Sequence, residues 1–181
     1  MKIRIEILSN TILGSGKSIP GGEDIGLLVD SEVFPYLRGS TFKGILREEI
    51  ENIIDWEGGD QDAVKRLFGT GGERGVDENQ LVISDFTLSD NVKNVIRKKD
   101  LIIERVTECF SSVYTFTSIE NGVAKKGSLR TCRYINKGIV FHGNIICCKD
   151  DEEILRKGLK AIKYIGTMRT RGFGRVKVRE E

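Results

Sequence analysis

The densest group of residues suited to binding a polyanion lies at residues 165–176 of the 181-residue chain. This segment, IGTMRTRGFGRV, contains three glycines, three arginines and one phenylalanine. Glycines bring backbone amides close to a phosphate, arginines donate forked hydrogen bonds, and an aromatic ring stacks on a base. The segment therefore indicates a ribose-phosphate binding loop, unless it is only a helix end and a tight turn whose arginines face water. The residues that would make the contacts are Arg169, Arg171, Gly172, Phe173 and Arg175.

A second cationic segment, LRGSTFKGILRE, occupies residues 37–48 at the start of a helix-like pattern. Free amide groups at a helix N-terminus bind phosphate readily, and hydroxyl and basic side chains add further donors. The donors in this segment are Arg38, Ser40, Thr41, Lys43 and Arg47. We expect this segment and the 165–176 loop to fold side by side as a cradle for one RNA strand.

The distribution of charge, rather than its total, points to a nucleic-acid partner. The chain has 29 basic and 27 acidic residues, and the resulting net charge of +2 predicts nothing by itself. Residues 125–137 carry five basic residues and no acidic one, and every charged residue from 157 to 179 is basic. Such segregation is typical of one phosphate-facing surface, although two basic faces in water would also show it. In the first stretch we expect contacts from Lys125, Lys126 and Arg130.

Hydrophobic periodicity predicts the elements that position these segments. Strands are expected at 2–9, 80–88, 138–147 and 174–179, and helices at 40–57, 60–68 and 151–165. The main order, β, α, β, β, α, β, indicates an α+β fold with a ferredoxin-like (RRM-like) palm. Asn121 and Gly122 predict a hairpin turn. We expect one domain over residues 1–181, with an insertion at about 89–137 that includes this hairpin.

Composition excludes several other classes of protein. The four cysteines, Cys109, Cys132, Cys147 and Cys148, show no C-x-x-C spacing, so neither a zinc site nor a disulfide framework is indicated. The N-terminus has no signal-peptide pattern, and no stretch approaches the roughly 20 apolar residues of a membrane span. We therefore expect a soluble, cytoplasmic protein with no membrane partner.

The two glycine- and arginine-containing segments together resemble the RAMP superfamily of CRISPR effector proteins. In that family a G-S-S-[LF]-K-G-x-[LI]-R helix start and an R-x-R-G-[FL]-G-R loop recur, and they stand here as GSTFKGILR and RTRGFGR. Leu67-Phe68-Gly69 with the strand-like LVISDF at 81–86 is similar to another family segment. Residues 117–129, followed by 138–141, are similar to its thumb hairpin and return strand. The resemblance covers almost the whole chain.

Within the superfamily, the chain looks most like the repeating, Cas7-like backbone subunit of type III complexes. Such subunits carry G-G-x-D, a short apolar run and a second aspartate, as GGEDIGLLVD does at residues 21–30. The resemblance implies that Asp24 cleaves target RNA paired to the guide, with a transiently bound divalent metal, Mg²⁺ or Mn²⁺. Gly26 stands where relatives usually have a proline, and Asp24 as a turn residue is the alternative. We expect Asp30 to orient the loop.

The same resemblance implies a set of partners. These are crRNA, complementary target RNA, other CRISPR effector subunits and further copies of the chain in a helical filament. Two alternatives stay open: a non-catalytic structural or capping subunit, and a crRNA-processing endoribonuclease of the same superfamily. Near the hairpin, Val113, Tyr114 and Phe116 are expected either to wedge between nucleotides or to pack the hairpin itself.

Overall fold

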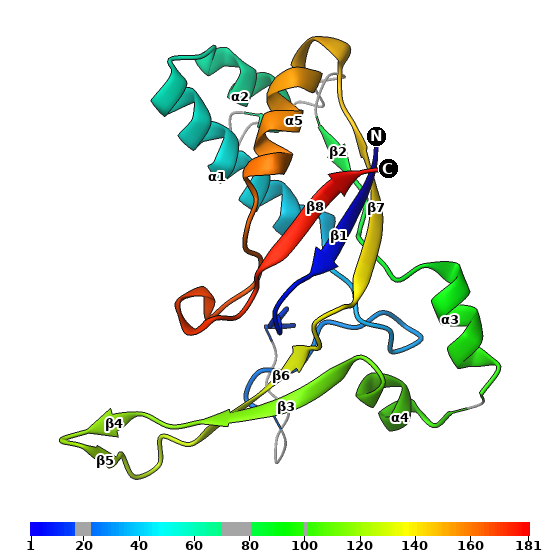
Figure 1. The fold of residues 1–181 in the computed structure, drawn as a ribbon, viewed down its shortest axis with the longest axis vertical. Helices are drawn as coiled ribbons and strands as arrows, with labels where there is room; N and C mark the ends of the chain where they lie inside the picture. The colour runs from blue at the N-terminus through cyan, green and yellow to red at the C-terminus, as the bar shows by residue number, and fades with distance from the viewer. Residues whose placement is uncertain (17–22, 70–80, 100) are drawn as a thin grey trace.

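The structure, a computed structural model, describes residues 1–16, 23–69, 81–99 and 101–181 (Figure 1). It combines helices with antiparallel sheets. In chain order the elements are β1 (Lys2–Ile7), α1 (Gly39–Glu57), α2 (Gln61–Phe68), β2 (Val82–Ile83), α3 (Asp90–Arg97), α4 (Ile103–Glu108), β3 (Ser111–Phe116), β4 (Ile119–Glu120), β5 (Val123–Ala124), β6 (Arg130–Ile135), β7 (Val140–Ile146), the 3₁₀ turn η1 (Lys149–Asp151), α5 (Glu152–Ala161), the 3₁₀ turn η2 (Arg169–Arg171) and β8 (Val176–Glu180).

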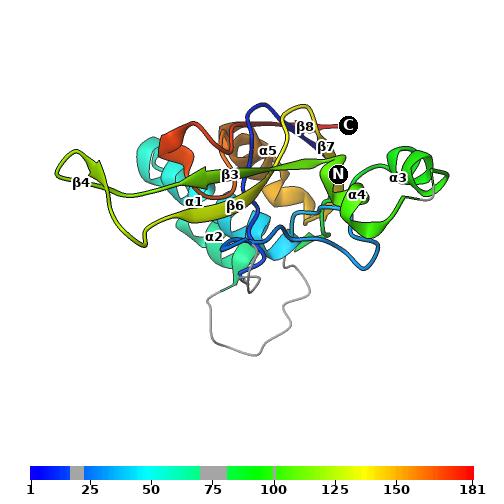
Figure 2. The same cartoon turned by 90° about the horizontal axis from the view of Figure 1, so that it is seen from below.

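The main sheet has four strands in the order β2-β7-β1-β8, and every neighbouring pair is antiparallel. Because side chains alternate along a strand, Ile3, Ile5 and Ile7 of β1 all enter the core from one face. Helices α1 and α5 cover this face, while the opposite face carries no helix among the described residues (Figures 1 and 2). That opposite side is called the open face below.

The core forms where α1 and α5 pack on each other and on the sheet. The helix predicted at 40–57 is confirmed as α1, and Phe42, Leu46 and Ile50 on its inner side are fully buried. Gly158 of α5 allows the close approach, because a β-carbon there would lie 2.5 Å from Cγ1 of Ile50. Of the described helices, none is long and apolar enough to cross a membrane.

Strands β3 and β6 form an arm that projects from the rest of the chain (Figures 1 and 2). Their register runs from Ser111 opposite Ile135 to Phe116 opposite Arg130, and β4 and β5 continue the arm to its tip. The predicted hairpin turn is confirmed: Asn121 and Gly122 have φ values of 53° and 80°, the left-handed pair that a two-residue turn requires. Residues 111–135 are called the arm below.

Two predicted elements fall short of their expected bounds by four residues or more, whereas β1 and β7 differ by only two or three. The helix expected at 151–165 ends at Ala161, because Ile162 adopts an extended backbone and leads into the 165–175 loop. The strand expected at 80–88 is regular only at Val82–Ile83, and Gln80 lies outside the described residues. Its ladder is interrupted at Ser84 and Asp85, where the start of α1 packs against the strand.

Candidate nucleic-acid interface

The predicted 165–176 segment forms a loop at residues 165–175, because Val176 is the first residue of β8. This loop is held in a defined conformation at the end of β1. The amide of Arg175 donates to Oγ of Ser9 (2.9 Å), and the amide of Gly174 donates to the carbonyl of Asn10 (2.9 Å). Met168, Gly172 and Gly174 all have positive φ, so the chain reverses direction sharply around η2. The anchored backbone leaves the side chains of Arg169, Arg171 and Arg175 exposed.

An aromatic cluster joins this loop to the base of the arm. The ring centroid of Phe173 lies 5.4 Å from that of Tyr114 on β3 and 5.9 Å from that of Tyr134 on β6. The guanidinium of Arg171 lies 5.5 Å from the centroid of Phe116. Tyr114 is 40% exposed, so the cluster presents an aromatic surface beside cations. Tyr134 was not among the predicted residues, because its place in the cluster depends on the pairing of β3 with β6.

A hollow of about 410 Å³ borders the same loop, lined by Leu8, Ser9, Asn10, Lys137, Gly172 and Phe173. Lys137 is exposed there and forms no ion pair with a described residue. Aromatic ring, ammonium group and exposed arginines therefore meet in one place, which is the combination that binds single-stranded nucleic acid.

The start of α1 is arranged differently from what the sequence indicated. The amide of Gly39 donates to Oδ1 of Asp85 at 2.8 Å, so a carboxylate of the chain already occupies part of the helix N-terminus. The ammonium of Lys43 donates to the carbonyl of Leu81 at 3.1 Å, and burial lowers the pKa of Lys43. These two hydrogen bonds hold the start of α1 to the β2 segment, so the Gly39 amide and one donor of the Lys43 ammonium are used within the chain.

The remaining predicted donors of α1 are on its surface. Arg38, Ser40 and Thr41 are exposed, and Arg47 forms an ion pair with Glu51 (2.7 Å) one turn along the helix. The guanidinium of Arg38 and the hydroxyl groups of Ser40 and Thr41 are therefore exposed near the start of α1, whereas the guanidinium of Arg47 is engaged by Glu51.

The structure does not bring the two predicted segments side by side. The start of α1 contacts β2 at one edge of the main sheet, and the 165–175 loop leads into β8 at the other edge. Three strand spacings separate those edges, or about 14 Å. No contact between described residues links Lys43 with Arg171. The expected single cradle is therefore replaced by a loop-and-arm site and a separate helix start.

Asp24 lies beside strand β6 of the arm. Its amide donates to the carbonyl of Thr131 (2.8 Å), and its Oδ2 accepts from the amide of Thr131 (2.7 Å). Oδ1 lies 3.9 Å from Arg130, and 43% of the side chain is exposed. The carboxylate thus has one oxygen engaged with the arm and one directed toward a cation and solvent. Residues 21 and 22 of the predicted motif lie outside the described residues.

Other charged groups attach the segment around Asp24 to the arm and to α3. Glu23 forms a half-buried ion pair with Arg133 of β6 (2.6 Å). Asp30 accepts hydrogen bonds from the amides of Glu32 and Phe34, and its Oδ2 lies 3.0 Å from Lys93. The expectation that Asp30 orients the loop agrees with these contacts.

At the tip of the arm, Lys125 pairs with Glu120 across the hairpin (3.3 Å). Lys126 and Arg130 are exposed. The arm therefore offers at least two cations along its length that a polyanion can reach without breaking a close ion pair.

Metal binding near Asp24 would depend on groups from outside the chain. In the part of the chain that the structure describes, no three His, Cys, Asp or Glu residues cluster as a metal site. Mg²⁺ is commonly held by one or two carboxylates together with substrate phosphates and water. The partly exposed Oδ1 of Asp24, which has Arg130 at 3.9 Å, could join such a shared ion, but the described residues do not form a cage for one.

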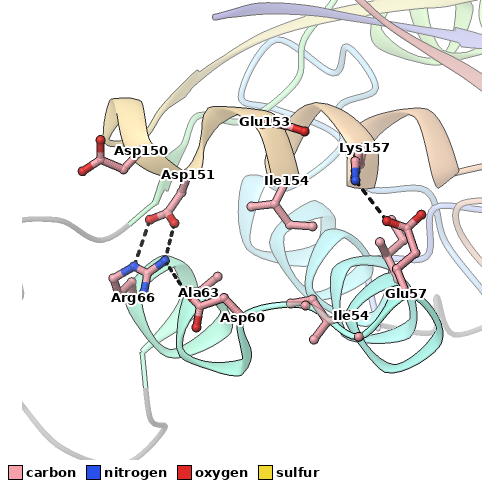
Figure 3. A pocket seen from close by; sticks show the side chains of 13 residues that line it. Ile54, Glu57, Asp60, Ala63, Arg66, Asp150, Asp151, Glu153, Ile154 and Lys157 are labelled. Carbon is pink, nitrogen blue, oxygen red and sulfur yellow. Dashed lines mark hydrogen bonds and ion pairs between the residues drawn. The ribbon is translucent and has the colours of Figure 1, made fainter.

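A pocket of about 360 Å³ on the helical side does not belong to this interface (Figure 3). It lies between the end of α1, α2 and α5. Arg66 bridges Asp60 (2.9 Å) and the buried Asp151 (2.7 Å), and Lys157 pairs with Glu57 (3.0 Å). None of the predicted RNA-binding residues lines it. Its charges are largely paired within the pocket and fasten the three helices together.

Comparison with known proteins gives both a family and a fold. The model of the RAMP superfamily matches residues 4–177. A chain of the type III-B Cmr-beta complex bound to cognate target RNA superposes with a TM-score of 0.72 at 13% identity, covering 98% of this chain and 95% of that one. A chain of the apo state of type III-B Cmr-beta gives 0.74 at 14% identity, with the same coverage. No curated protein matches the sequence.

Proposed function

We propose, from the premise that the chain belongs to the RAMP superfamily, that it is a crRNA-binding backbone subunit of a type III CRISPR effector complex. The observation that carries the proposal is the joining of Arg171 and Phe173 to the aromatic side chains at the base of the arm. Stacking rings beside exposed cations bind a single strand with little preference for sequence.

The architecture of the chain supports a ferredoxin-like palm with the arm as its thumb. The strand order β2-β7-β1-β8, with α1 and α5 on one face, is what two interleaved βαβ units produce. The arm lies between β2 and β7 in the sequence, inside the segment 89–137 that we assign as an insertion.

Further partners follow from the same proposal. The structural neighbours come from type III-B Cmr-beta complexes, one of them bound to cognate target RNA. We assign to this chain, by that likeness of fold, complementary target RNA, other effector subunits and further copies of itself. A head-to-tail contact between copies need not close into a ring, so it would generate a helical filament along the guide, in the cytoplasm.

The second part of the proposal is that Asp24 takes part in cleaving target RNA that is paired to the guide. The position of Asp24 beside β6 supports it, because an arm that displaces a base would leave the adjacent phosphate near this carboxylate. Asp24 would share a Mg²⁺ or Mn²⁺ ion with RNA and water, and the ion would supply charge stabilisation at the phosphate.

One observation favours a non-catalytic scaffold instead. Oδ2 of Asp24 accepts a 2.7 Å hydrogen bond from the amide of Thr131, so this carboxylate already has a structural role in holding its loop to the arm. A structural aspartate at this position would serve a subunit that only binds RNA.

Two Asp24 variants separate these functions in a complex reconstituted with crRNA. Asp24→Asn keeps an oxygen for the Thr131 amide but loses the charge, and Asp24→Ala loses both. If Asp24 is catalytic, both variants assemble but stop cleaving complementary RNA in Mg²⁺. If it is structural, Asp24→Asn cleaves as the wild type does, whereas Asp24→Ala is less stable by about 1.5–3 kcal/mol, the range for a hydrogen bond to a charged group.

RNA binding by the full-length chain is tested with Phe173→Leu, which keeps an apolar side chain but removes the ring. Loss of one stacked base is worth about 1–3 kcal/mol, so affinity for a single-stranded RNA should fall roughly 5- to 150-fold. Phe68→Leu, on α2 and away from the loop, is the control for loss of a ring. Equal affinity of wild type and Phe173→Leu would contradict the assigned binding surface.

A further inference from the structure

Strand β8 carries a row of cations on the open face of the main sheet. Arg175, immediately before the strand, and Lys177 and Arg179 within it are all exposed. The residues that alternate with them face the helices: Val176 is buried, Val178 packs against the core, and Glu180, after Arg179, pairs with Arg156 of α5 at 3.1 Å. Alternation along the strand therefore places three cations on the open face and none of them toward the core. We call Arg175, Lys177 and Arg179 the β8 row.

The charges of the β8 row are not neutralised within the described chain. None of the three forms an ion pair with a described residue. In the β1–β8 register Arg4 lies directly opposite Arg179, so two guanidinium groups share one face. Like charges placed opposite each other destabilise a sheet. Glu6 lies opposite Lys177 in the register, but its carboxylate pairs with Arg4 at 3.8 Å and forms no ion pair with Lys177.

The β8 row continues the 165–175 loop without a break. Arg171 and Phe173 belong to the loop-and-arm site, and Arg175 follows them into the strand. Alternate residues of a strand are about 6.8 Å apart, so the row spans about 14 Å. With phosphates spaced about 3.4 Å along a stacked strand, and more when it is extended, the row faces about two to four of them.

From this continuity we infer that a single RNA strand, after passing the loop-and-arm site, runs along the open face of β8 with its phosphates on Lys177 and Arg179. The inference rests on the proposed RNA-binding function and adds a path to it. Cations on an edge strand also hinder edge-to-edge pairing of sheets. Protection of the sheet edge does not explain why Arg4 lies opposite Arg179. A bound polyanion does explain it, because its phosphates would reduce the repulsion between the two guanidinium groups.

The test compares two doubly substituted full-length chains of equal net charge. Lys177→Gln with Arg179→Gln neutralises the row, and Lys149→Gln with Lys160→Gln removes two exposed cations from the helical side. The probe is a fluorescein-labelled oligouridine of about 12 nucleotides, within the range that one binding domain covers. Its Kd is measured by anisotropy at several salt concentrations.

Neutralising the row should weaken binding at least about 10-fold. It should also reduce the slope of log Kd against log salt concentration by about 1.4, or about 0.7 for each lost phosphate contact. The control should change Kd less than about 2-fold. Exchanging the two charges, with Lys177→Arg and Arg179→Lys, should retain wild-type affinity. Thermal unfolding should show a Tm for the neutralised chain equal to or above that of the wild type, because the Arg4–Arg179 repulsion is gone.

The outcomes distinguish this inference from the proposed function. If the wild type binds no RNA, both fall. If the wild type binds and the neutralised row behaves as the control does, RNA binding stands and the path along β8 is wrong. Unchanged RNA affinity combined with loss of assembly with other subunits would assign the row to an acidic protein surface and overturn the inference.

Discussion

Replacing Gly39 with alanine tests how the start of α1 is positioned. A β-carbon at Gly39 would lie 2.5 Å from the carbonyl oxygen of Ile83 and 2.7 Å from that of Ser84. Carbon–oxygen contacts normally begin at about 3.3 Å, so the helix start must retreat from β2 by about 0.8 Å. The same movement would lengthen the 2.8 Å hydrogen bond from Gly39 to Asp85 beyond bonding distance.

The energetic effect follows from these two distances. Forcing an extra carbon into a packed contact costs about 1–3 kcal/mol, and losing a hydrogen bond to a charged group costs about 1.5–3 kcal/mol. Replacing a helical glycine with alanine recovers up to about 1 kcal/mol. We therefore expect Gly39→Ala to lower the free energy of unfolding by about 1.5–5 kcal/mol and Tm by roughly 3–20 °C.

Gly44 provides the matched control, because it lies in the same helix and the same motif. A β-carbon at Gly44 would meet no atom within 4 Å. Gly44→Ala should therefore raise the free energy of unfolding by about 0.5–1 kcal/mol. Both variants are measured by urea unfolding and differential scanning calorimetry. If Gly39→Ala were as stable as Gly44→Ala, the steric explanation for the first glycine of the motif would be wrong.

Two further predictions concern charged groups. Arg66→Ala leaves the buried carboxylate of Asp151 without its main donor and should cost about 1–3 kcal/mol in urea unfolding, whereas Lys65→Ala, in an exposed pair, should change stability by less than about 0.5 kcal/mol. Arg97 holds the pKa of Glu32 below its ordinary value of 4.5, so this pair stabilises the fold above that pH and the contribution is lost as pH falls below it. Tm measured from about pH 6 to about pH 3 should therefore decline less steeply in Glu32→Gln, and an equal decline would contradict the assignment.

Local patterns in the sequence predicted the elements that are set by residues close together in the chain. The alternation of Ile3, Ile5 and Ile7 predicted β1, and Asn121 with Gly122 predicted the hairpin turn, because these signals depend on a few consecutive residues. Within the expected insertion at 89–137 only the hairpin turn was predicted, and the structure adds α3, α4 and β3 ahead of it. Short helices with little buried surface leave a weak periodic signal.

The composition of the loop and of the helix start was evident from the sequence, but the partners of their side chains were not. Asp85 caps α1 from 46 residues away, and Lys43 reaches Leu81 from 38 residues away. Both contacts use donors, the Gly39 amide and the Lys43 ammonium, that were predicted to bind RNA. The order of residue types along the chain does not show whether a donor already forms a hydrogen bond with a carbonyl or carboxylate far away in the sequence.

What the sequence determined by itself is the set of local elements and the two glycine- and arginine-containing segments. Even the alternation of Arg175, Lys177 and Arg179 with Val176 and Val178 is present in it. Only the tertiary structure decided that β2 and β8 form opposite edges of the sheet, which separates the two segments, and that the helices cover one face. The physical reason is that strand order and burial depend on contacts between residues far apart in the chain, whereas periodicity records only neighbours.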